Sequence, residues 1–107
     1  MIISGGVNIY PQEVEDCLVL HEKVVDAAVF GLPDPDMGEF VQAVVQPAEG
    51  VEIGDALAEE LTQYMRGAIA HYKVPKVIDF RDELPRLESG KLYKGVLKAE
   101  YQAAADT

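Results

Sequence analysis

The stretch that decides the fold reads VVDAAVFGLPDPDMGEFVQAVVQ and runs from Val24 to Gln46. Its first part, Val24–Leu32, is short, apolar and rich in β-branched residues, which predicts a strand. Residues 33–38 contain prolines and a glycine that cannot continue the strand, so a loop is expected there. Residues 39–46 alternate between two faces with apolar side chains on each, which predicts a second strand. The sequence therefore predicts an antiparallel hairpin with a wide loop.

A helix is expected on the N-terminal side of this hairpin. Pro11 suits the first helical position, and Glu13 and Glu15 lie in the early turns, where negative charge suits the helix dipole. The helix is expected to end between His21 and Lys23. Its inward stripe, at helical spacing, consists of Val14, Cys17, Leu18 and His21.

Further elements follow the hairpin. Apolar residues at helical spacing predict a helix from Asp55 to Ala70 and another from Tyr93 to about Ala104, and a short strand is expected at Val77–Arg81. The tail of residues 105–107 is expected to fray. The order α-β-β-α-β-α describes a small α+β domain, in which a roughly three-stranded sheet has helices packed against it. With 107 residues, the chain is long enough for one domain.

The net charge of the chain argues against two classes of binding partner, nucleic acids and anionic membranes. The chain carries 19 acidic and 9 basic side chains, for a formal net charge of −10. Non-specific binding to nucleic acids or anionic membranes needs basic surface, so neither partner is expected. Against this acidic background, the few clustered lysines become candidate binding groups.

The cysteine, the histidines and the hydropathy of the chain bear on its cellular location and on metal binding. Cys17 is the one cysteine, so no internal disulfide can form, which fits a reducing cytoplasm, and its place on an apolar helix face predicts a buried, inert thiol. His21 and His71 lack partners at metal-ligand spacing, so no metal site is expected. No apolar run approaches the ~20 residues of a membrane span and no signal peptide is recognised, so we expect a cytoplasmic location without a membrane span.

The segment Leu84-Pro85-Arg86-Leu87-Glu88-Ser89-Gly90-Lys91-Leu92 carries the strongest candidate site residue. Gly90 permits a sharp turn immediately before Lys91, which then has a long stem and a compact charge suited to a phosphate or carboxylate. The plain alternative is an idle surface lysine. The chain shows no nucleophile–base pair and no complete phosphate-binding loop, so Lys91 would have to act on a substrate held elsewhere.

Together with the N-terminal run MIISGGVNIYPQEVE, this segment resembles the C-terminal domain of AMP-forming acyl-CoA synthetases, within the adenylate-forming enzyme superfamily. The resemblance covers nearly the whole chain. Three further landmarks occur in the expected order, namely VFGLPDP at residues 29–35, Gly38-Glu39, and HYKVPK at residues 71–76.

The resemblance implies a function for several residues. Lys91 would be the catalytic lysine that contacts the carboxylate and the α-phosphate as the acyl-adenylate forms. After a large rotation of the domain, Ser4, Gly5 and Gly6 would line the tunnel for the pantetheine arm of CoA. The nucleotide part of CoA would meet a group formed by Tyr72, Lys73 and Lys76.

The resemblance also implies partners. ATP or AMP, Mg²⁺ and the carboxylic acid would be held by an N-terminal domain that is absent from this chain, as is the hinge expected upstream of Ile2. The isolated chain is therefore expected to be inactive. Two departures bear on the CoA residues: Val74 stands where a family member may carry arginine, and Met37 where an aromatic residue is common.

Alternatives remain at this point. Gly5 and Gly6 could form a simple turn, Tyr72 could belong to the core, and Lys76 could be solvated. The whole chain could be a free-standing, non-catalytic α+β interaction or regulatory module. It could also be the C-terminal part of a carrier-protein-directed adenylation domain, although Gly5–Pro11 resembles acyl- or aryl-CoA ligases more closely. The identity of the acid is not encoded in this domain.

Overall fold

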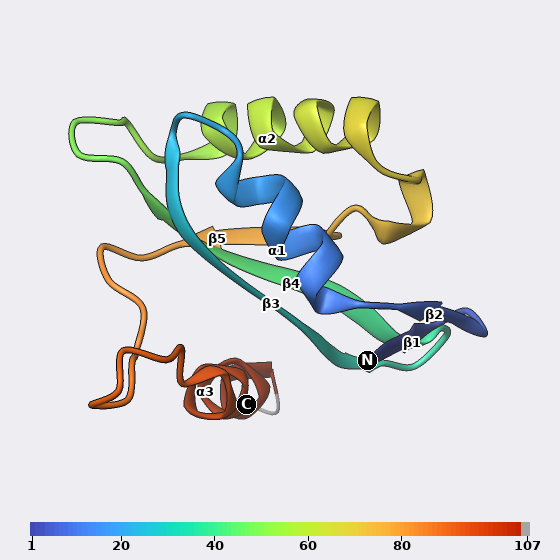
Figure 1. Cartoon of the computed structure of the whole chain (residues 1–107). Helices are drawn as coiled ribbons and strands as arrows, with labels where there is room; N and C mark the ends of the chain where they lie inside the picture. Colours follow the sequence, from blue (N-terminus) through green and yellow to red (C-terminus); the bar gives the residue numbers. More distant parts are fainter. Residues whose placement is uncertain (106–107) are drawn as a thin grey trace.

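The computed structural model describes residues 1–105, and within that range the chain forms a five-stranded sheet, three α-helices and one short 3₁₀ helix (Figure 1). The elements, in chain order, are β1 (Ile2–Ser4), β2 (Val7–Ile9), α1 (Pro11–Val19), β3 (Val24–Asp34), β4 (Gly38–Pro47), α2 (Asp55–Ala68), η1 (His71–Lys73), β5 (Val77–Phe80) and α3 (Lys94–Ala105). The predicted α+β class and the order α-β-β-α-β-α are confirmed. The frayed tail was expected from residue 105, but α3 includes that residue, and residues 106–107 lie outside the described part.

The antiparallel hairpin predicted from residues 24–46 forms the centre of the sheet. β3 and β4 pair in continuous register from Asp26↔Gln46 to Asp34↔Gly38. The other side of β4 pairs with β5 in parallel and with β1 at its first residue, so the strand order is β2-β1-β4-β3 with β5 beside β4. β3 is therefore an edge strand.

The sheet is larger than the roughly three strands expected, because β1 and β2 form a small hairpin before α1. Each of these strands has three residues, which is too short to produce a readable two-residue alternation. The tight turn between them was predicted and is confirmed. Two helices end earlier than expected. Helix α1 ends at Val19 rather than between His21 and Lys23, and α2 ends at Ala68 rather than at Ala70.

Helices cover both faces of the sheet. α1 and α2 lie on one face, and α3 lies on the other (Figure 1). β4 contributes to both cores, because Val41, Ala43 and Val45 face α1 and α2, while Val44 faces α3. The second core is completed by Ala28, Phe30, Leu32, Leu84 and Leu97.

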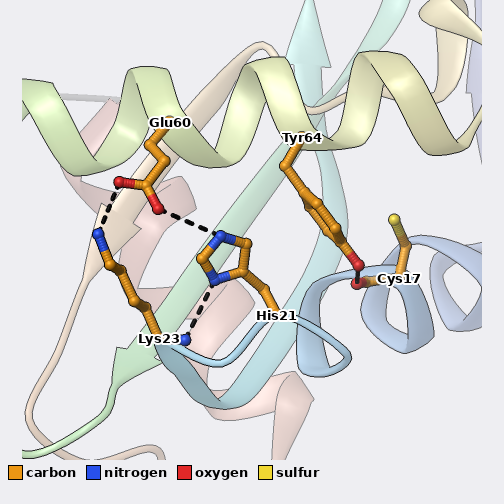
Figure 2. Close-up of polar contacts among 5 residues, drawn as sticks. All are labelled: Cys17, His21, Lys23, Glu60 and Tyr64. Carbon is orange, nitrogen blue, oxygen red and sulfur yellow. Dashed lines mark hydrogen bonds and ion pairs between the residues drawn. The ribbon is translucent and has the colours of Figure 1, made fainter.

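A polar cluster joins α1 to α2 (Figure 2). The Tyr64 hydroxyl donates to the Cys17 carbonyl at 2.8 Å, in the last turns of α1, where carbonyls lack helical partners. His21 Nδ1 accepts the Lys23 amide at 3.1 Å, and its Nε2 lies 3.3 Å from Glu60. The Lys23 ammonium, hydrogen-bonded to Glu60, holds the pKa of that carboxyl below its ordinary value. These contacts are internal, which indicates a structural role.

The predicted burial of Cys17 is confirmed, with 7% of the residue exposed. Burial raises the pKa of its thiol, so the thiolate that would react with oxidants or electrophiles is disfavoured. The thiol therefore acts as a small apolar group in the core.

Candidate functional site

Lys91 follows the tip of a small hairpin between β5 and α3. The Leu87 amide donates to the Lys91 carbonyl, and the Gly90 amide donates to the Leu87 carbonyl, each at 2.8 Å. Gly90 has a φ of +87°, in the left-handed region that residues with a Cβ adopt at a cost. The pattern is a tight turn closed by a glycine bulge, as expected from the sequence.

The register of this hairpin determines which side chains face the domain. Arg86 pairs with Leu92, so these two side chains share one face, and Leu87 and Lys91 share the other. Leu92 packs against the second core, whereas Leu87 and Lys91 are exposed. Among residues 1–105, no side chain forms a hydrogen bond or ion pair with the Lys91 ammonium. The charge is thus free to engage a group outside the domain.

The Ser4–Gly6 segment forms the turn between β1 and β2. Gly5 and Gly6 have φ values of +57° and +80°, which match the two central positions of a type I′ turn. The Gly5 amide donates to the Met37 carbonyl at 2.8 Å, and a Cβ on Gly5 would lie 2.5 Å from the Met37 methyl carbon. A Cβ on Gly6 would meet no atom within 4 Å. The turn is thus closely packed on one side and open on the other.

The segment from residue 71 to 76 presents one aromatic and two cationic side chains. Tyr72 is 55% exposed, so the alternative that it belongs to the core is wrong. The Lys73 ammonium binds both carboxylate oxygens of Glu13, at 2.8 and 3.0 Å, and this hydrogen bonding raises its pKa. Lys76 is freer: its side chain is 68% exposed, and its ammonium lies 3.6 Å from Asp34.

Asp34 connects this segment to the glycine turn. Its Oδ1 accepts the backbone amides of Asp36 and Met37, at 2.9 and 3.1 Å, while its Oδ2 faces Lys76. These amides, with Lys76 as a smaller contribution, lower the pKa of the Asp34 carboxyl. Because the Met37 carbonyl in turn accepts the Gly5 amide, the β3–β4 turn links both candidate CoA segments.

The candidate residues therefore form two groups. Ser4, Gly5, Gly6, Tyr72, Lys73 and Lys76 gather at the end of the domain that carries the β1–β2 hairpin and η1, whereas the Lys91 hairpin lies at the opposite end (Figure 1). Sequence analysis singled out no role for Asp34, Arg86 or Asp26, which hold these segments in place. The signal for Asp34 was present, since an aspartate between prolines favours a side-chain-capped turn.

Two further features concern metals and membranes. Within residues 1–105, no group of three or more histidine, cysteine, aspartate or glutamate side chains is arranged to hold a metal ion. None of the helices in the same range combines the length and apolarity that a membrane crossing requires.

Comparison with known proteins identifies the family. The family model described as the AMP-binding enzyme C-terminal domain matches residues 13–91. A feruloyl-CoA synthase from an Amycolatopsis species is 48% identical over 101 residues, which are 94% of this chain and 20% of that protein. A long-chain-fatty-acid–CoA ligase from Bacillus subtilis is 44% identical over 100 residues, 94% of this chain and 17% of that protein.

Solved structures agree. The crystal structure of an acyl-CoA synthetase from Brucella canis matches with a TM-score of 0.92 at 38% identity, covering 99% of this chain and 19% of that one. The chain thus spans about a fifth of the length of the relatives it matches. On this evidence the chain belongs to the family of AMP-binding enzyme C-terminal domains, and these relatives bear the names of acyl-CoA synthetases and ligases.

Proposed function

We propose that residues 1–107 are the mobile C-terminal lid of an ATP-dependent, AMP-forming acid–CoA ligase, working with an N-terminal domain that binds ATP and the carboxylic acid. In the first half-reaction, a carboxylate oxygen attacks the α-phosphorus of ATP and pyrophosphate leaves. In the second half-reaction, the sulfur of CoA attacks the acyl carbonyl of the adenylate, loses its proton, and AMP leaves. Mg²⁺, held with ATP by the N-terminal domain, would help to neutralise the phosphate charges.

Lys91 is the residue that serves the first half-reaction. The carboxylate and the α-phosphate are both anionic, so a cation placed between them offsets their repulsion and the charge that develops as they react. The observation that carries this proposal is the exposed Lys91 ammonium, which has no partner within residues 1–105 and is carried by a hydrogen-bonded hairpin. The alternative, an idle surface lysine, is decided by the Lys91→Ala test described below.

The opposite end of the domain serves the second half-reaction. Ser4, Gly5 and Gly6 line the pantetheine tunnel, and the open side of Gly6 leaves room for a thin ligand against the backbone. Tyr72 offers an exposed ring for stacking on adenine, and Lys76 an exposed cation for the CoA phosphates. Lys73 contributes its positive charge while bound to Glu13. The arrangement at two ends supports a rotation of the lid between the half-reactions.

The domain supports a proposal for the location of the enzyme but not for the acid that it activates. The relatives reported above are named for an aromatic acid and for long-chain fatty acids, and the acid-binding pocket belongs to the N-terminal domain, so the acid is not assigned. The single, buried cysteine supports a location in a reducing cytoplasm.

The test compares Lys91→Ala with native full-length enzyme. Adenylation is followed as pyrophosphate release with whichever of ferulate, acetate and palmitate the native enzyme activates fastest, and thioester formation is followed from preformed acyl-adenylate. We expect adenylation to fall by about 100- to 1,000-fold, because a transition-state charge contact is lost, while thioester formation stays within about twofold.

Lys98→Ala is the matched control, since it removes a lysine charge from α3 rather than from the hairpin. It should leave both half-reactions near native rates. Equal loss of both half-reactions in Lys91→Ala would contradict the assignment of the two ends to separate steps, and unchanged adenylation would remove Lys91 from the mechanism.

A further inference from the structure

We propose that Arg86 is a positioning residue for Lys91, which acts by fixing the peptide bond that precedes Lys91 to the edge strand β3. This inference rests on the proposed function, because it concerns how the adenylation lysine is delivered. Arg86 makes no contact with a reacting atom in this account.

The guanidinium of Arg86 bridges the hairpin tip and the sheet. Its Nη1 donates to the Gly90 carbonyl at 2.8 Å, and its Nη2 forms an ion pair with the Asp26 carboxylate. A planar guanidinium with several fixed donors can hold two acceptors at once in a defined geometry, which an ammonium cannot do. Because the Gly90 carbonyl belongs to the peptide bond joining Gly90 to Lys91, its orientation determines where the Lys91 side chain begins.

Asp26 is a suitable anchor for this contact. It lies on β3, opposite Gln46 of β4, and its side chain is 18% exposed. Its Oδ1 accepts the Ala27 amide at 2.9 Å, which restricts the carboxylate. Its Oδ2 is buried, and Arg86 is the one cation that contacts it within residues 1–105. A buried carboxylate oxygen without a protein hydrogen bond is costly, so the cation is strongly favoured there.

The other contacts of the hairpin leave its direction unspecified. The backbone bonds from Leu87 to Lys91 and from Tyr93 to Pro85 hold the two arms to each other. Leu84 is buried and Leu92 partly buried in the second core, and these residues anchor the base. Neither set fixes the tip against the sheet. Within residues 1–105, the contact of Arg86 with Asp26 is the one ion pair that joins the hairpin to β3.

Loss of this bridge should spread the Lys91 ammonium over many positions. The lid would still close and the charge would still be present, but fewer closures would place it between carboxylate and phosphate. The expected kinetic signature is a lower kcat for adenylation with an unchanged KM for ATP. A lysine at position 86 keeps the charge but cannot hold Asp26 and Gly90 together, so it should rescue only in part.

The experiment uses full-length enzyme carrying Arg86→Ala, Arg86→Lys, Asp26→Asn or Arg66→Ala, each also combined with Lys91→Ala. Arg66 is an exposed arginine on α2, a helix that lies far from the lysine hairpin in Figure 1, and it serves as the control for adenylation, where it should leave the rate near native. Adenylation and thioester formation are measured separately, as for Lys91→Ala, and thermal unfolding checks that each variant is folded.

We expect Arg86→Ala to slow adenylation by about 10- to 100-fold and Arg86→Lys and Asp26→Asn by less, with thioester formation within about twofold. In the Lys91→Ala background, Arg86→Ala should cost little more, since a residue that acts through Lys91 has nothing left to position. Additive losses would show that Arg86 acts independently and would overturn the inference. Normal adenylation by Arg86→Ala, with Lys91→Ala impaired, would also overturn it while leaving the proposed function intact. Normal adenylation by Lys91→Ala would instead remove the proposed role of Lys91, and with it the residue that Arg86 is proposed to position.

Discussion

Lys94 on α3 forms an ion pair with Glu15 on α1, with 2.5 Å between Nζ and Oε2, and so joins helices that lie on opposite faces of the sheet. The same Oε2 accepts the Val29 amide of edge strand β3 at 2.7 Å. One carboxylate therefore satisfies a backbone donor at the open edge and holds the first turn of α3, three residues after Lys91. The contact protects the edge of the sheet and holds the start of α3.

Glu15→Ala should destabilise the domain by about 1–3 kcal/mol, because it leaves the buried Val29 amide and the Lys94 ammonium without their partner. Urea unfolding of the 107-residue chain measures the change. Glu13→Ala, two residues earlier in α1 and exposed, removes only the surface ion pair with Lys73; it is the comparison and should cost less. Lys94→Ala in the Glu15→Ala background should add little, and fully additive losses would mean that the two side chains do not act together.

Local patterns were sufficient for the pairing of β3 with β4 and for both glycine turns, although the loop is shorter than expected, because β3 continues through Pro33 to Asp34 and β4 begins at Gly38. Each depends on residues close together in the chain, where periodicity or positive φ limits the options. Glu15 could not be predicted in this way. Its place in the early turns of α1 indicated only a charge that suits the helix dipole, whereas the folded chain buries it against β3 and α3.

In the candidate site, too, local features could be predicted from the sequence, whereas features set by long-range contacts could not. The turn before Lys91 could be predicted because Gly90 determines it, but the direction of the hairpin depends on Arg86 reaching Asp26, sixty residues away in sequence. The state of Lys73 likewise depends on Glu13, from a helix near the other end of the chain. Long-range ion pairs of this kind leave no spacing pattern in a single sequence, so the availability of each lysine had to come from the fold.

Gly5→Ala and Gly6→Ala separate backbone conformation from packing at the predicted pantetheine turn. Both place a Cβ at positive φ, which costs about 1–2 kcal/mol, but only the Cβ of Gly5 would meet the Met37 methyl carbon. Gly5→Ala should therefore be the less stable variant in thermal unfolding. Adding Met37→Ala should bring it close to Gly6→Ala. If Met37→Ala leaves the gap unchanged, side-chain crowding is not its cause.

Lys76→Ala should weaken CoA binding without affecting adenylation. Its ammonium is the more exposed of the two lysines near Tyr72, so it can reach a phosphate, whereas Lys73 is held by Glu13. Loss of one charge-assisted contact predicts a rise of about tenfold in the KM for CoA, measured with full-length enzyme and saturating ATP and acid. The effect should shrink as salt is added. A comparable rise in Lys98→Ala would point to a general charge effect.

Asp34 should make the stability of the domain depend on pH in the acid range. The amides of Asp36 and Met37 lower the pKa of its carboxyl in the folded state. Folding is therefore favoured by the ionised form. This contribution is fully present above the ordinary aspartate pKa of about 4 and is lost as the pH falls through the lower, folded-state value.

Asp34→Asn keeps an oxygen acceptor but removes the charge, so it should be less stable than the native chain at pH 7, and the two should converge as the pH falls through the lowered, folded-state pKa of Asp34. Urea midpoints measured from pH 7 down into the acid range follow the convergence. Asp36→Asn is the matched control, because the Asp36 side chain makes no hydrogen bond or ion pair within residues 1–105, and its profile should run parallel to the native one. A constant gap between Asp34→Asn and the native chain across the range would mean that the charge of Asp34 does not stabilise the β3–β4 turn.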